Sequence, residues 1–151
     1  MSILNRIRSL ISGFPFFNEV TRVARYVTVA GSGFTIPDPN ADLPVSDRHI
    51  QDIDAPGVVG NAFAVVFYRT DHTGSPTFTV RLNTTRLTAH AFGHPGPDSW
   101  HEVIPPGVLK AEDNELTLAV SGEGSVTFSD IVILYTSDQV KVKEEPVLTQ
   151  G

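Results

Sequence analysis

The stretch from Asn114 to Tyr135 constrains the fold of this chain more than any other stretch does. Between residues 115 and 121, large apolar side chains alternate with polar and small ones. This period of two is typical of a strand with one buried face. Gly122-Glu123-Gly124 follows, and its two glycines can adopt the positive φ angles of a tight turn. Residues 125–135 alternate at first and then become almost wholly apolar. The stretch therefore predicts a β-hairpin whose second strand enters the core.

Composition favours a single domain built from strands. The 151 residues include eleven prolines and twelve glycines, which favour short elements joined by turns over long helices. The formal net charge of −6 argues against nucleic acid as a partner, because phosphate binding needs a basic face. The chain has no cysteine, so a disulfide framework, a thiol nucleophile and a thiolate metal site are excluded.

Residues 1–13 predict a short amphipathic helix at the N-terminus. One face of this helix is apolar, and the opposite face carries serine, asparagine and arginine. An isolated helix of this length is marginal in water, so its apolar face needs a surface to pack on. We expect the helix to cap an open end of the chain's own sandwich; docking of residues 1–12 on a second copy or another assembly partner, and binding to a membrane surface, are the alternatives. The docking residues are Ile3, Ile7, Leu10 and Ile11.

The chain contains no obvious membrane or export signal. No apolar run approaches the roughly 20 residues that span a bilayer, so we expect no transmembrane segment. The N-terminus also lacks the unbroken apolar stretch and small-residue cleavage site of a signal peptide. These observations favour a location in the cytoplasm or within an assembly.

Residues 14–137 predict a β-sandwich, and residues 138–151 a loose polar tail. Alternating or continuously apolar runs indicate seven or eight antiparallel strands with a turn signal every 8 to 15 residues. Residues 31–61 contain many prolines, glycines and aspartates, so we expect a long connection without regular structure there, of the kind that often carries binding function. The expected strands cover residues 22–30, 62–69, 77–82, 87–91, 100–104, 115–121 and 125–135.

The segment from Thr77 to Tyr135 resembles the galactose-binding-domain-like jelly roll of carbohydrate-binding modules and of the sugar-binding domain of family 2 glycoside hydrolases. The matching features are the strand Phe78–Asn83, the strand around Trp100, the closing residues 129–135, and a proline-rich loop that leads through Leu109 and Lys110 to Asn114. In such domains the asparagine closes the turn with its side chain. The resemblance implies an antiparallel jelly-roll β-sandwich and ligand binding without catalysis.

A carbohydrate is the ligand class that the sequence favours. Flat aromatic rings cover the apolar faces of sugars, and polar side chains beside them bind hydroxyl groups. Leu87, Ala89 and Ala91 predict the inward phase of their strand, so Phe92 is expected to point outward near the following loop. For Trp100, burial in the core is favoured over a place in the sugar-binding platform. The expected ligand-binding residues are Phe92, His94, Asp98 and Trp100.

Two metal sites are further hypotheses. Solvated carboxylates that cap turns are the favoured interpretation of Asp38, Asp42 and Asp47 in the long acidic connection. Binding of a structural calcium by these hard oxygen ligands is the hypothesis, because the resemblance implies a jelly roll of a type that often holds one. The group of His90, His94 and His101 with Asp98 has the ligand types of a zinc-dependent enzyme. We expect His90 on an outward strand position, and no named metalloenzyme motif accompanies the group.

Asp130 tests the predicted phase of the closing strand. Counting by twos from Val126 and Phe128 places its carboxylate on the core face, where an unpaired charge is costly. We expect it to be held there by an arginine or by backbone N–H groups. A β-bulge that turns the side chain outward, or a buried ion, are the alternatives.

The sequence therefore favours a non-enzymatic jelly-roll module that binds a glycan. A structural subunit of a virion, an appendage or a similar assembly, docked through its N-terminal helix, is the alternative. A metal-dependent enzyme is a weaker one.

Overall fold

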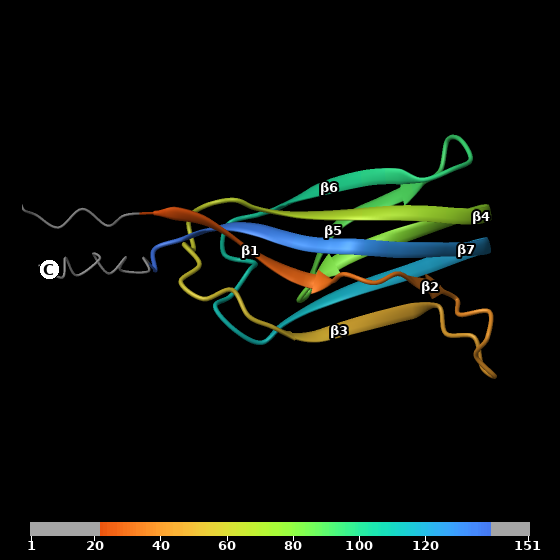
Figure 1. Ribbon diagram of the computed structural model, residues 1–151, viewed down its shortest axis with the longest axis horizontal. Helices are drawn as coiled ribbons and strands as arrows, with labels where there is room; N and C mark the ends of the chain where they lie inside the picture. The colour runs from red at the N-terminus through yellow and green to blue at the C-terminus, as the bar shows by residue number, and fades with distance from the viewer. Residues whose placement is uncertain (1–21, 140–151) are drawn as a thin grey trace, which may run out of the picture. The chain divides into compact units, whose positions relative to one another are not determined.

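Two long strands dominate the computed structural model, which describes residues 22–139 (Figure 1). β4 (Ala64–Leu82) and β7 (Asn114–Ser137) pair antiparallel along almost their whole length, from Val65 opposite Leu134 to Leu82 opposite Leu116. The described part of the chain is all-β, and the two long strands pair antiparallel with each other and with four of the five shorter strands. The five shorter strands are β1 (Val23–Ala30), β2 (Phe34–Ile36), β3 (Asp47–Ile53), β5 (Thr85–Ala91) and β6 (Asp98–Ile104).

β4 folds back on itself near its middle. The rings of Tyr68 and Phe78 lie 6.0 Å apart, although ten residues of straight strand span about 33 Å. Phe78 also lies 5.4 Å from the ring of Phe128, whose partner in the ladder is Thr70. The two halves of the β4–β7 ribbon therefore face one another, and the long strands run side by side through the bend (Figure 1).

The shorter strands extend the two halves of the ribbon into two layers. In the first layer β6 pairs with residues 64–70 of β4, and β2 pairs with residues 126–128 of β7. In the second layer β5 pairs with residues 77–82 of β4, and β3 pairs with the start of β7. β1 is also hydrogen-bonded to β7. Two antiparallel layers with a shared interior are compatible with a β-sandwich.

Inward side chains of both layers form one core. Even-numbered residues of β4 are buried on either side of the bend, and the start of β7 has the same alternation. Burial of these apolar side chains is the main favourable contribution to folding. The largest fully buried side chains are Tyr68, Phe78, Phe128, Leu82, Ile104, Leu116, Leu118, Ile131 and Ile133.

The predicted hairpin turn at Gly122-Glu123-Gly124 is wrong, because these residues lie inside β7. The connection expected between the strands 62–69 and 77–82 likewise lies inside β4. The two segments pair with each other, with Gly74 opposite Gly124. Both glycines have positive φ angles, 72° and 116°. A Cβ on Gly74 would lie 2.6 Å from the carbonyl oxygen of Glu123, so only glycines let the two backbones approach this closely at the bend.

The predicted burial of Asp130 is also wrong. Asp130 has a φ of 53°, and the ladder register shifts between its neighbours Phe67 and Arg69 on β4. This bulge moves the inward phase from even to odd residues, so Ile131 is fully buried while the Asp130 side chain is 54% exposed. The carboxylate pairs with Arg69 at 3.7 Å on the surface.

The prediction that residues 31–61 lack regular structure fails as well, since β2 and β3 both form there. The expected N-terminal helix and its docking residues lie outside the described residues, as do residues 140–151 of the expected tail. Contacts group Ala24–Ser137 into one compact unit.

Gly124→Ala should destabilise the protein by more than about 2 kcal/mol, because the added methyl group overlaps the carbonyl oxygen of Thr73 at a positive φ. Gly93→Ala is the matched control, since its Cβ would meet no heavy atom within 4 Å. We expect the control to stay within about 1 kcal/mol of the wild type in urea unfolding. A loss at Gly124 no larger than that of the control would contradict the folded ribbon.

Candidate functional site

The aromatic residues predicted for ligand binding pack inside the protein. Phe92 and Trp100 are partly buried against the core, and the Trp100 Nε1–H donates a 2.7 Å hydrogen bond to Thr70 Oγ1. The Phe92 ring stacks on His72 with centroids 3.9 Å apart. The prediction that Phe92 points outward is wrong, because a register shift next to Val80 places the even-numbered residues Thr88 and His90 inward, and Phe92 continues this phase. The same shift corrects the predicted inward phase of Ala89 and Ala91, which are exposed.

The polar members of that predicted site lie at the surface between β5 and β6. His94 Nε2 lies 3.4 Å from Asp98 Oδ1, and the His94 side chain is 66% exposed. The carbonyl oxygen of His94 lies 3.1 Å from His72 Nε2. All four predicted residues thus lie close to the connection between β5 and β6, but the rings of Phe92 and Trp100 pack against other residues of the protein and are not free to contact a ligand.

His90 points inward, which corrects its predicted outward position. Its Nε2 lies 3.0 Å from Glu102 Oε2, and the same oxygen accepts a 3.0 Å hydrogen bond from the Tyr68 hydroxyl. Burial, together with the adjacent Glu102 carboxylate, raises the pKa of Tyr68. His101 instead lies beside the Phe67 ring, with centroids 6.1 Å apart. Among the described residues, no group of three histidine or carboxylate side chains is arranged to hold a metal ion.

The predicted calcium ligands are only partly brought together. Asp38 and Asp47 line one open hollow of about 450 Å³, and Asp42 is not among its lining residues. Asp38 Oδ1 accepts a 2.9 Å hydrogen bond from the Asn40 N–H, which closes a local turn. Calcium binding at these residues stays a prediction.

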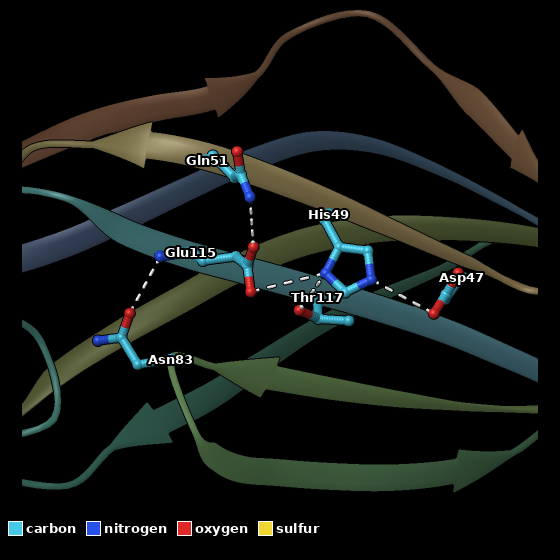
Figure 2. Close-up of polar contacts among 6 residues, drawn as sticks. All are labelled: Asp47, His49, Gln51, Asn83, Glu115 and Thr117. Atoms are coloured by element: carbon cyan, nitrogen blue, oxygen red, sulfur yellow. Dashed lines mark hydrogen bonds and ion pairs between the residues drawn. The ribbon is translucent and has the colours of Figure 1, made fainter.

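A row of polar side chains covers the outer face of β3 and β7 (Figure 2). Asp47, His49 and Gln51 alternate outward on β3, because Ile50 between them points inward opposite Leu116. β7 adds two further outward side chains, and we call the whole group the β3–β7 polar row. Its members are Asp47, His49, Gln51, Glu115 and Thr117.

Members of the β3–β7 polar row hold one another in place. Gln51 Nε2 donates a 2.8 Å hydrogen bond to Glu115 Oε2, and the other Glu115 oxygen lies 3.6 Å from His49 Nδ1. His49 Nδ1 is also 3.2 Å from Thr117 Oγ1, and its Nε2 is 3.3 Å from Asp47 Oδ2. These contacts link side chains of β3 with side chains of β7.

The environment of Glu115 favours its ionised form. The hydrogen bond from Gln51 is the largest cause that lowers the Glu115 pKa, and His49 adds a hydrogen bond and an attractive charge. A lowered folded-state pKa contributes stability above the unfolded-state pKa, and this contribution disappears as the pH falls through the folded value. The carboxylate therefore remains an acceptor to lower pH than an ordinary glutamate does.

An open hollow of about 370 Å³ adjoins the β3–β7 polar row. Gln51 and Glu115 form one wall, and the turn after β4 forms another through Asn83, whose Oδ1 accepts a 3.0 Å hydrogen bond from the Glu115 N–H (Figure 2). All its lining residues have polar side chains: Gln51, Asp52, Asn83, Thr84, Asp113, Asn114 and Glu115.

Asn114 joins the three segments around this hollow. Its side chain is fully buried, and its Nδ2 donates to the carbonyl oxygens of Ile53 (2.8 Å) and Lys110 (2.7 Å). Its Oδ1 accepts from the Lys110 N–H at 2.8 Å and from Asn83 Nδ2 at 3.1 Å. The prediction that this asparagine closes the preceding loop is confirmed, and the same side chain also fixes the end of β3.

The β3–β7 polar row was not predicted from the sequence. Residues 47–53 alternate weakly, with Ile50 and Ile53 as the inward residues, but the surrounding prolines and glycines favoured a loop. The alternation of β7 did place Glu115 and Thr117 on the outward side of the strand, yet it could not indicate which strand lies beside them.

No protein-family model matches this chain, and neither does any curated protein or solved structure. Over the described range, no helix has the length and apolar character that a membrane crossing requires.

Asn114→Ala should lower the free energy of unfolding by about 3 kcal/mol, because it leaves buried backbone groups of Ile53 and Lys110 without partners. Asn40→Ala is the control, since Asn40 is exposed and should change stability by less than about 0.5 kcal/mol. Equal unfolding midpoints for the two variants in urea would contradict this role.

Proposed function

We propose that this protein is a non-enzymatic jelly-roll module that binds a glycan through the β3–β7 polar row and the adjoining hollow. The jelly-roll assignment is supported by the loop that ends at Asn114, which has the asparagine-closed form expected from the resemblance. Two packed antiparallel layers are consistent with that architecture.

The β3–β7 polar row is the observation that carries the glycan proposal. Sugar hydroxyls both donate and accept hydrogen bonds, so they suit a surface that offers carboxylate acceptors and an amide with a donor and an acceptor group. Gln51 and Glu115 offer these groups on adjacent strands, and their mutual hydrogen bond orients them before a ligand arrives. Preorganisation of this kind reduces the entropy that binding loses.

The lining of the hollow favours neutral sugars over acidic ones. Asp52, Asp113 and Glu115 carry negative charge, and no arginine or lysine is among the lining residues. A sialic or uronic acid would meet like charge there, at a cost that low salt increases. The ligand class is therefore a neutral oligosaccharide.

A structural subunit is the second candidate function. The predicted docking residues of the N-terminal helix lie outside the described range. An assembly role is favoured by exposed apolar side chains on the first layer, where Phe67 and Val103 are 42% and 52% exposed.

A glycan array, run with calcium and with a chelator, tests the binding proposal on the full-length chain. We expect signals on neutral glycans, and a loss of affinity of about tenfold for Glu115→Gln, which weakens a charge-assisted hydrogen-bond acceptor. Binding should also persist below the usual pKa range of a glutamate, because the pKa of Glu115 is lowered.

Glu123→Gln is the matched control, since Glu123 is exposed at the bend of the ribbon, away from the hollow. It should bind like the wild type. Silence across diverse glycans would remove the proposed function, and equal losses in both variants would move the site elsewhere. Signals that require calcium would instead support the predicted ligands Asp38, Asp42 and Asp47.

A further inference from the structure

The outer face of the first layer is largely apolar over two adjacent rows, with a histidine at one border. Val103 of β6, Val65 of β4 and Leu134 of β7 are ladder partners and form one row. His101, Phe67 and Val132 form the next row. Phe63 directly precedes β4 and continues its outward alternation. We call this surface the apolar face.

The apolar face is exposed in the described part of the chain. Phe63, Phe67, Val103 and Leu134 have 66%, 42%, 52% and 38% of their surface exposed. The solvent side of an antiparallel sheet is normally polar, so a contiguous apolar surface across three strands indicates a contact with another molecule.

Charge makes a second copy of the chain a suitable occupant. The protein carries a formal net charge of −6, which makes two copies repel one another overall and disfavours contacts that bring carboxylates together. The two apolar rows contain no carboxylate. In the adjoining row Arg69 lies between Ser99 and Ser129, and it pairs with Asp130 at 3.7 Å. Two such faces can therefore meet without placing like charges together.

The area of the apolar face also fits a dimer. A stable interface of standard size covers about 800 Å² per partner, and a little over half of that area is apolar. The exposed parts of the four large side chains supply on the order of 400 Å². His101, Arg69 and Ser129 at the border supply the polar rim that such interfaces have.

We propose that the apolar face is a homodimer interface, in which a second copy of this chain packs sheet face against sheet face about a two-fold axis. In this arrangement each copy covers the same residues of the other, so one substitution changes both sides of the contact. This surface shares β7 with the β3–β7 polar row, but it uses Val132 and Leu134 in the other layer, so the proposal does not depend on glycan binding.

Sedimentation equilibrium of the full chain tests the dimer. We expect a monomer–dimer equilibrium with a Kd of about 1–100 µM. Val103→Glu introduces two carboxylates into the contact and should raise the Kd more than tenfold. Val103→Thr is the second variant, for the case in which Val103→Glu does not fold. It keeps a β-branched side chain suited to a strand, and it should also weaken the dimer. Leu43→Ser is the matched control, because it removes an 80% exposed apolar side chain outside the apolar face and should leave the Kd unchanged.

A wild type that remains monomeric at about 1 mM, tenfold above that range, overturns the proposal. Dimers that are unaffected by both Val103 variants would place the interface elsewhere and also overturn it. If the wild type is monomeric and the full-chain variant carrying Ile7→Ser and Leu10→Ser dimerises, the N-terminal segment occupies the face in place of a second copy.

Discussion

The close approach of Gly74 and Gly124 is the constraint on which the other features depend. The β4–β7 ribbon can serve both layers only if it bends without losing its pairing, and a bend of this kind needs residues without a Cβ where the backbones meet. Once the ribbon is folded, Phe78 meets Phe128 across the interior, and the remaining strands extend the two layers. Core packing, strand order and the two exposed faces all follow from this bend.

Asn114 connects the folded ribbon to the candidate site. Its four hydrogen bonds fix the start of β7 against the end of β3 and the turn after β4. The β3–β7 polar row therefore lies on strands whose relative positions are set from within the protein. The opposite layer presents a different surface, because the bulge at Asp130 turns Leu134 outward beside Val65. A polar face suited to hydroxyl groups and an apolar face suited to a protein surface thus belong to different layers.

The sequence predicted the all-β class, the residues of most strands and the loop closure by Asn114, because local alternation and turn chemistry determine these features. It misassigned Gly122-Glu123-Gly124, since glycines that permit a turn are the same glycines that permit two backbones to cross closely. The phases of β5 and of the end of β7 were wrong because each contains a register shift, which alternation alone does not reveal. The polar row was missed because it joins residues 47–51 to residues 115–117, and that pairing is set by long-range topology.

Nuclear Overhauser contacts between ring protons test the folded ribbon most directly. The folded ribbon predicts contacts between Tyr68 and Phe78, ten residues apart on one strand, and between Phe78 and Phe128. It also predicts cross-strand backbone contacts between Gly74 and Gly124. Contacts between residues 121 and 125 across a tight turn, together with the absence of those between Phe78 and Phe128, would show a hairpin and contradict the account.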